Sequence, residues 1–452
     1  MNYIKEYLKK FELKKDKISI VYNDKSYTYE SLLNKIKFYK KYILNNNIKK
    51  GEVVSIVGDY SLESISLFFS LCINNNIIVP ITSSNKEEIN IKLNESSTDW
   101  VIYIDSLILN KNNYKRKKNK LLKKLIDDND PGLILFSSGS TGIPKSMLHN
   151  LSTILSLYLK NKFRNHTYLV FLMFDHIGGL NTMFNIFSMT STMVIPKKRD
   201  PENISRLIEK YKVRILPASP TFLNLMYLNK CFDKYDFSSV ILITYGTEPM
   251  SEILLNKLRD ILPKTKFLQT FGTSETGIIK TISKSSSSLL IKFDDPNQEY
   301  KIVNDELWLR SKTQVLGYLN HSNKNFTNDG WFKTGDLVEV YDEKFLKIKG
   351  RKKEVINIGG EKVLPIEVES VINKLDYIND CTIYSENHSI MGQIMIARIV
   401  IDSDKDFKEI KKHVRKHCKK YLDSFKVPSK FIIKKEIEFS NRFKKKRLYN
   451  DK

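Results

Sequence analysis

Residues 135–146 read Leu135-Phe-Ser-Ser-Gly-Ser-Thr-Gly-Ile-Pro-Lys-Ser146, joining an apolar strand-like run to a loop of serine, threonine and glycine. Glycines let the backbone approach a ligand closely, and hydroxyls with free N–H groups can hold phosphate oxygens. Lys145 adds a positive charge, and a helical stretch is expected from about Asn150. The spacing differs from the common nucleotide loop, GxxxxGK followed by Ser or Thr, and a plain Ser/Gly-rich turn is the alternative. The expected phosphate-loop residues are Ser137, Ser138, Gly139, Ser140, Thr141, Gly142 and Lys145.

On both sides of this loop, short apolar runs alternate with helical stretches. ISIVY, VVSIV, IIVPI and WVIYI precede it, and VRILPA and VILITYG follow it. This alternation predicts an α/β fold. Residues 110–130 are rich in Lys and Asn and then acidic, so we expect a surface excursion or linker there. We expect a large domain over residues 1–350, with mixed sheets flanked by helices, and a small, mobile α+β domain over residues 351–452.

The composition limits the classes of protein. The chain has 452 residues, 41% of them hydrophobic, which is enough for a packed core. Its net charge of +24 comes from lysines spread along the whole chain, without a zinc-finger or RNA-binding signature. Nucleic acid is therefore not expected as the primary ligand, while anionic small molecules and acidic protein partners are favoured.

The cysteines and the apolar runs indicate the compartment. Four scattered cysteines, Cys72, Cys231, Cys381 and Cys418, argue against a disulfide framework and fit a reducing environment. The N-terminus is charged throughout and lacks the apolar core of a signal peptide. The run at 67–73 is too short to span a bilayer. We expect a cytoplasmic protein without a membrane span.

The loop resembles the phosphate loop of the adenylate-forming (AMP-binding) superfamily, which includes acyl-CoA synthetases, peptide-synthetase adenylation domains and luciferases. Further segments resemble the later signatures of that superfamily in the same order, so the resemblance covers nearly the whole chain. These segments are Tyr245-Gly-Thr-Glu-Pro249, Thr270-Phe-Gly-Thr-Ser-Glu-Thr-Gly277, Glu306-Leu-Trp308 with Gly317-Tyr318, Trp331-Phe-Lys-Thr-Gly-Asp336, Gly350-Arg351 through Ile356, Gly359-Gly360, Glu367-Val-Glu369 and Ser440-Asn-Arg-Phe-Lys444-Lys-Lys-Arg447.

The resemblance assigns roles in ATP binding, with ATP and Mg²⁺ as cofactors. A carboxylate such as Glu275 is a hard oxygen ligand suited to Mg²⁺, and the Thr273 hydroxyl can bind phosphate. Asp336, when ionised, can accept from both ribose hydroxyls. The remaining residues expected at the nucleotide are Tyr245, Gly246, Thr247, Glu248, Pro249, Phe271, Gly272 and Arg351.

The resemblance also places a catalytic lysine near the C-terminus. Lys444 would supply a cation where negative charge develops at the carboxylate and the α-phosphorus. Most relatives have a Gly-Lys pair at this place, whereas Phe443 precedes Lys444 here, so Lys445 stays a rival. Lys353 matches the hinge position, which is often Asp in relatives, and the Gly359-Gly360 turn would line the thiol tunnel.

Phe174-Asp-His-Ile-Gly-Gly-Leu180 resembles the substrate-side motif of the superfamily. The motif has a histidine in CoA ligases and an aspartate in amino-acid activators, and this chain offers Asp175 and His176 side by side. The following IGGL, with Gly178, is closer to the CoA-ligase form and favours His176 at the pocket. If Asp175 faced the pocket, it could pair with a substrate ammonium group.

The resemblance implies two half-reactions. A small carboxylic acid attacks the α-phosphorus of Mg·ATP, and a pantetheine thiol, of coenzyme A or of an acidic acyl carrier protein, then takes the acyl group. A stand-alone adenylation enzyme that loads a carrier protein with an acyl or aminoacyl group is the alternative. A nucleotide sensor or scaffold without catalysis is disfavoured, because Thr141, Lys145, Glu275, Asp336 and Lys444 are all retained. The identity of the acid stays open.

Overall fold

The first sheet of the computed structural model is mainly parallel. The structure describes residues 3–112, 119–137, 143–389, 392–401, 406–434, 436, 438–440, 443 and 445. The strand order is β13 (Lys266–Gln269), β12 (Leu242–Tyr245), β11 (Ile215–Ala218), β9 (Thr167–Leu169), β10 (Thr192–Ile195), β1 (Ile18–Tyr22) and the antiparallel edge strand β2 (Lys25–Thr28). Asn23 and Asp24 both have positive φ in the turn between β1 and β2, as a two-residue hairpin loop requires.

A second sheet contains the strand that leads into the phosphate loop. Its order is β20 (Gly317–Tyr318), β8 (Lys145–Asn150), β7 (Gly132–Ser137), β4 (Ile77–Ile81), β3 (Val53–Val57), β5 (Trp100–Tyr103) and β6 (Ile108–Lys111). The strands β7, β4, β3 and β5 are parallel, whereas β8 runs back along β7. The β3 and β4 segments, VVSIV and IIVPI, are buried at every position, as expected for strands covered on both faces.

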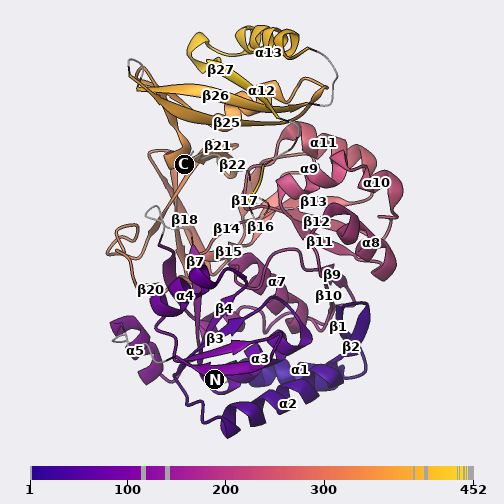
Figure 1. Cartoon of the computed structure of the whole chain (residues 1–452), viewed down its shortest axis with the longest axis vertical. Coiled ribbons are helices and arrows are strands. Elements are labelled where there is room, and N and C mark those ends of the chain that lie inside the picture. Colours follow the sequence, from indigo (N-terminus) through magenta and orange to yellow (C-terminus); the bar gives the residue numbers. More distant parts are fainter. Residues whose placement is uncertain are drawn as a thin grey trace.

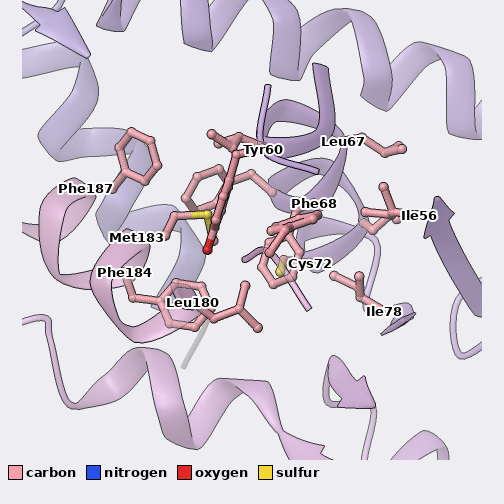
Figure 2. Packing of buried hydrophobic residues seen from close by; sticks show 14 of the residues in the cluster. Ile56, Tyr60, Leu67, Phe68, Cys72, Ile78, Leu180, Met183, Phe184 and Phe187 are labelled. Carbon is pink, nitrogen blue, oxygen red and sulfur yellow. The ribbon is translucent and has the colours of Figure 1, made fainter. Parts of the chain in front are cut away.

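Helices fill the space between these two sheets. They are α1 (Tyr3–Leu13), α2 (Tyr29–Asn45), α3 (Leu62–Ile73) and α7 (Ile177–Ser188). Phe68 of α3 packs on Phe184 of α7 with ring centroids 5.9 Å apart, and Phe69 packs on Phe187 at 5.6 Å. Figure 2 shows α3 and α7 pointing their apolar side chains at one another. This core fixes the start of α7, where the substrate-side motif lies.

The remaining helices of the large part cover the outer faces of the sheets, except α6 (Leu151–Ser156), whose buried residues pack in the core between the sheets. They are α4 (Lys86–Glu95), α5 (Lys120–Asp127), α6 (Leu151–Ser156), α8 (Pro201–Tyr211), α9 (Pro220–Leu228), α10 (Cys231–Lys234) and α11 (Glu252–Ile261). Residues 110–130, expected to be a surface excursion or linker, contain the packed helix α5. Its sequence, KLLKKLID, is amphipathic and buries Leu122 and Leu125 against the second sheet.

A third, antiparallel sheet links the large part to the C-terminal part. Its order is β16 (Thr281–Ser283), β17 (Ile291–Phe293), β22 (Phe345–Arg351), β21 (Phe332–Tyr341), β19 (Glu306–Ser311) and β18 (Gln298–Val303). A separate hairpin, β14 (Phe271–Thr273) and β15 (Gly277–Ile279), stands between the first and third sheets in the chain.

The C-terminal part has its own sheet and core. The sheet comprises β24 (Glu361–Val363), β23 (Ile356–Ile358), β26 (Gly392–Ile401), β25 (Ile378–His388) and β27 (Lys430–Lys434), with α12 (Pro365–Ile372) and α13 (Phe407–Tyr421) packed on it. In Figure 1 it lies at the opposite end of the molecule from α1–α3. The expected architecture, α/β with mixed sheets and a smaller α+β unit at the C-terminus, is confirmed. Across the described helices, none is both long and apolar enough to span a bilayer.

Candidate active site

Three separate segments bring Lys145, Tyr318 and Glu275 together. The Tyr318 hydroxyl donates to Oε1 of Glu275 over 2.8 Å, and Nζ of Lys145 lies 5.6 Å from the centroid of the Tyr318 ring. Tyr318 is held there because β20 pairs with β8, the strand that begins at Lys145. Burial first, and then the Glu275 charge, raise the pKa of Tyr318, so its hydroxyl stays a donor. Tyr318 lies in a motif visible in the sequence, but nothing in the sequence indicated its role.

The phosphate loop is described only at its two ends. Ser137 ends β7 and faces Lys145 in register across the hairpin. Residues 138–142, which include the predicted Ser138, Gly139, Ser140, Thr141 and Gly142, lie outside the described part of the chain.

The β14–β15 hairpin fixes Thr273 and Glu275. The Thr273 hydroxyl accepts from the Thr276 N–H over 3.1 Å, which closes the tight turn that contains Glu275. A Cβ on Gly272 would lie 2.6 Å from the Gly277 carbonyl oxygen, so the two strands approach each other this closely only with glycine there. Phe271 packs on Phe293, with ring centroids 5.7 Å apart.

Asp336 is a buried carboxylate with one described cationic neighbour. Its side chain is 7% exposed, and its Oδ1 lies 3.1 Å from Nε of Arg351. Burial raises the pKa of Asp336, and the Arg351 guanidinium acts in the opposite direction. The two residues face each other in register across β21 and β22, so the third sheet holds the pair in place.

The predicted adenine loop follows β12. The parallel strands β11, β12 and β13 end at the same edge of the first sheet, where ligands bind in open α/β sheets. A Cβ on Gly246 would lie 2.6 Å from Oγ1 of Thr270, so only glycine fits beside β13. Thr247 has φ +73°. Glu248 and Pro249 line a cavity of about 300 Å³ between the large part and the C-terminal part. The Tyr245 side chain is buried, which raises its pKa.

The Glu248 side chain has partners within the protein. Its Oε1 accepts from the Thr221 N–H at the start of α9, over 2.7 Å, and its Oε2 accepts from the Lys445 N–H over 3.2 Å. Burial raises the pKa of Glu248, although these two N–H groups lower it. Glu248 therefore joins the large part to the C-terminal segment.

Asp175 and His176 have different surroundings. Asp175 is buried, and its Oδ2 lies 3.5 Å from Nζ of Lys92, a buried lysine of α4 that also pairs with Glu88 at 2.7 Å. His176 is the N-cap of α7, and its Nδ1 accepts from the Gly178 N–H over 3.1 Å. Nothing in the sequence signalled Lys92, because it lies far from the motif along the chain.

The predicted hinge and glycine turn lie on the surface. Lys353 is exposed in a 3-10 turn (Lys352–Glu354), next to Lys352, whose Nζ lies 3.3 Å from Oε2 of Glu306. Gly359 and Gly360 form the exposed turn between β23 and β24, with φ +59° and +98°. The Gly360 N–H donates to the Asn357 side chain over 2.9 Å.

The C-terminal lysines differ in what the structure describes. Lys444 lies outside the described residues. Nζ of its rival Lys445 lies 2.5 Å from Oδ1 of the buried Asp380 and donates to the Cys381 carbonyl over 3.0 Å. The Lys445 cation is therefore held by the C-terminal part.

Family models match both parts of the chain. The model described as AMP-binding enzyme matches residues 9–319, and the model described as AMP-binding enzyme C-terminal domain matches residues 367–444. The chain therefore belongs to the AMP-binding enzyme family, within the adenylate-forming superfamily. Enzymes of this family use ATP, and its CoA ligases join a carboxylic acid to CoA.

Similar proteins are CoA ligases. The chain is 27% identical to 4-coumarate-CoA ligase 1 of Narcissus pseudonarcissus over 345 residues, which are 67% of this chain and 63% of that protein. It is 24% identical to a 2-succinylbenzoate-CoA ligase of Listeria monocytogenes over 461 residues, with 95% of each chain covered.

Solved structures share the fold. An anthranilate CoA ligase in complex with anthranoyl-AMP matches with a TM-score of 0.82 and 17% identity, over 98% of this chain and 95% of that one. The o-succinylbenzoate CoA synthetase of Bacillus subtilis, in complex with its acyl-adenylate, matches with a TM-score of 0.77 and 20% identity, over 99% and 97%.

Proposed function

We propose that this enzyme activates a small carboxylic acid as an acyl-adenylate and transfers the acyl group to the thiol of coenzyme A. A carboxylate oxygen attacks the α-phosphorus of ATP, and the bond to the bridging oxygen breaks as pyrophosphate leaves. The thiol sulfur then attacks the acyl carbon, and AMP leaves with that carboxylate oxygen while the thiol proton goes to solvent. The convergence of Lys145, Tyr318 and Glu275 carries this proposal, because it sets a cation and a carboxylate beside each other at the end of the phosphate loop.

The residues fit Mg²⁺ brought in by the nucleotide. Within the described ranges, no group of three or more His, Cys, Asp or Glu side chains could hold a metal alone. Mg²⁺ that keeps its phosphate and water ligands needs only one carboxylate from the protein. Glu275, oriented by Tyr318, would be that carboxylate. When bound, the ion neutralises charge on the phosphates.

The other predicted nucleotide contacts belong to this proposal. Asp336 would accept from the ribose hydroxyls, and the Arg351 guanidinium favours its ionised form. Because the Glu248 carboxylate already accepts two backbone N–H groups, we assign contacts with adenine to Tyr245 and to the backbone of Gly246 and Thr247.

The acid is proposed to lack a free α-amino group, with His176 at the pocket. The Asp175–Lys92 pair supports this specificity, because the Asp175 charge is already balanced by a buried cation of the protein. A substrate ammonium group would have to compete with Lys92.

An acidic carrier protein is the second candidate for the acyl acceptor. The exposed face of α13 carries many basic residues that could attract it, and Glu409 is its one acidic residue. The basic residues are Lys408, Lys411, Lys412, Arg415, Lys416, Lys419 and Lys420. The cytoplasmic location also stays a proposal, supported by four free, buried cysteines.

The two half-reactions are proposed to use two poses of the C-terminal domain, which we place from residue 351 onward. The domain would pivot about Arg351–Lys353, taking Lys444 away from the phosphate and bringing Gly359-Gly360 to the thiol tunnel. Lys444 is favoured over Lys445 as the catalytic lysine, because Lys445 is engaged by Asp380.

Pyrophosphate release tests the proposed function. The wild-type chain is incubated with ATP, Mg²⁺ and short, long, aromatic, hydroxy and amino acids, and thioester formation is then compared with CoA and with phosphopantetheinylated carrier protein. We expect acid-dependent pyrophosphate release and a CoA thioester. ADP as the nucleotide product, or no acid dependence across the panel, would contradict the proposal.

Separate half-reactions test the two poses and the choice of lysine. Lys444→Ala should lose adenylate formation by on the order of a hundredfold and spare transfer from presynthesised acyl-adenylate. Lys353→Pro should do the reverse, because proline stiffens the pivot. Equal loss in both steps for each variant would count against two poses. Loss centred on Lys445→Ala would move the catalytic role to that residue.

A further inference from the structure

The ring of Phe443 is partly buried and packs against the core of the large domain. Its centroid is 5.1 Å from the ring of Phe171 and 5.1 Å from the ring of Phe222, which themselves pack at 4.2 Å. Phe171 and Phe222 are buried in the cluster built on β11, β12 and α9. Phe439 of the same C-terminal segment stacks on Phe443 at 5.1 Å with an interplanar angle of 19°. A side chain from the end of the chain thus completes an aromatic cluster of the large domain.

The backbone of Phe443 is fixed at the same place. Its carbonyl accepts from the Ser219 hydroxyl over 2.8 Å, and its N–H donates to the Ser440 carbonyl over 2.8 Å. Its φ is +51°, in the left-handed region that disfavours a residue with a Cβ. Strained conformations of this kind persist where the surroundings determine them, and here the aromatic cluster and Ser219 do so.

Lys445 ties the next part of the segment to both domains. Its N–H donates to Glu248 of the large domain, and its ammonium group pairs with Asp380 of the small domain. Phe439 and Lys445 also form an isolated antiparallel bridge, so the segment folds back on itself between the two domains. Residues 443 and 445, which flank Lys444 in the sequence, are therefore both attached to the large domain.

We propose that Phe443 is a positioning residue, an aromatic anchor that docks the C-terminal segment on the large domain and so holds Lys444 for adenylate formation. The inference rests on the proposed function, because it assigns Lys444 to the first half-reaction. It goes beyond that function by naming the contact that selects the adenylation pose. In the second pose the ring must leave the Phe171–Phe222 cluster, so the anchor acts in one half-reaction only.

Variants at Phe443 separate the ring from the backbone. Phe443→Ala removes the ring and keeps a Cβ, whereas Phe443→Gly removes the ring and also relieves the disfavoured φ. Phe443→Leu keeps an apolar side chain that can enter the cluster. Phe407→Ala removes an exposed phenylalanine at the start of α13 and serves as the matched control.

The two half-reactions are measured separately for each variant, with the acid that the wild type activates. We expect Phe443→Ala and Phe443→Gly to slow adenylate formation by about thirtyfold to a hundredfold, with transfer from presynthesised adenylate unchanged. Phe443→Leu should recover most of the rate, and Phe407→Ala should match the wild type. Wild-type adenylate formation in Phe443→Gly, or equal loss in both half-reactions, would overturn the anchor.

Hydrogen exchange of the full chain tests docking without any activity. The Lys445 N–H donates to Glu248 and the Phe443 N–H to Ser440, so the peptide over residues 439–445 should exchange slowly in the wild type. We expect about tenfold faster exchange in Phe443→Gly and unchanged exchange in Phe407→Ala. Unchanged exchange in Phe443→Gly would overturn the anchor. A wild type that docks the segment yet releases no pyrophosphate with any acid would instead contradict the proposed function.

Discussion

Nε of Arg351 lies 3.1 Å from Oδ1 of Asp336, and the two residues face each other across β21 and β22. Arg351 is also the first residue of the proposed pivot. The guanidinium that counters the effect of burial on the pKa of Asp336 therefore belongs to the segment about which the small domain is proposed to turn. The proposed ribose contact and the proposed pivot thus share one ion pair.

Loss of the Arg351 charge should weaken ATP binding most at low pH. Burial raises the pKa of Asp336 and Arg351 opposes this effect, so Arg351→Met should raise that pKa further. A protonated Asp336 cannot accept from both ribose hydroxyls. We expect the KM for ATP to rise about tenfold at pH 6 and less at pH 8. Lys349→Met, which removes a cation of β22 paired with Glu339, is the control. A pH-independent effect in Arg351→Met would contradict this role of Asp336.

The Tyr318–Glu275 hydrogen bond should matter for adenylate formation at limiting Mg²⁺. Tyr318→Phe keeps the ring near Lys145 but removes the donor to Glu275, so we expect about a tenfold loss of rate that higher Mg²⁺ partly restores. Glu275→Gln should lose more of the rate of adenylate formation than Tyr318→Phe, and it should keep its fold. The rate is followed by pyrophosphate exchange against Mg²⁺ concentration, with Tyr300→Phe on β18 as the matched control. Wild-type exchange in Glu275→Gln would remove Glu275 from the metal site.

The buried pair of Asp175 and Lys92 should affect stability more than substrate choice. Asp175→Asn leaves Lys92 with Glu88 alone, and we expect a loss of about 2 kcal/mol in the free energy of unfolding. The double variant Lys92→Met/Asp175→Leu should recover much of this loss, because it removes both charges together. Denaturant unfolding gives the stabilities. If an amino acid is the preferred substrate and Asp175→Ala abolishes its selection, Asp175 belongs to the substrate pocket instead.

His149 should make the fold sensitive to acid. It is buried on β8, neither ring nitrogen has a hydrogen-bond partner among the residues that the structure describes, and burial lowers its pKa to about 4. In the unfolded chain the pKa of His149 is about 6.5. Between pH 6.5 and pH 4 the unfolded chain therefore binds a proton at His149 that the folded protein does not bind, so stability falls as the pH falls. Between pH 7 and pH 4.5, the free energy of unfolding should fall by about 2.5 kcal/mol less in His149→Phe than in the wild type. His413→Gln, at an exposed position of α13, is the control. An unchanged pH dependence in His149→Phe would contradict this account.

The sequence predicts the elements and the local motifs because both depend on neighbouring residues. The runs ISIVY, VVSIV and IIVPI became β1, β3 and β4, since their β-branched residues suit buried strands. The motifs at Glu275 and Asp336 could be found because they resemble signatures of the superfamily that follow the phosphate loop in the same order.

Long-range partners could not be predicted in the same way. Lys92 meets Asp175, and Phe443 meets Phe171 and Phe222, only after helices and sheets have packed. The helix α5 was missed because its lysines dominate the composition, although Leu122 and Leu125 recur at helical spacing.

Transfer of an oxygen label tests acyl-adenylate formation most directly. The preferred acid, labelled with oxygen-18 in its carboxylate, is converted with ATP, Mg²⁺ and CoA, and the nucleotide product is analysed by mass spectrometry. If the carboxylate attacks the α-phosphorus, the released AMP carries one labelled oxygen and the pyrophosphate carries none. Label in inorganic phosphate, with ADP as the nucleotide product, would contradict the account.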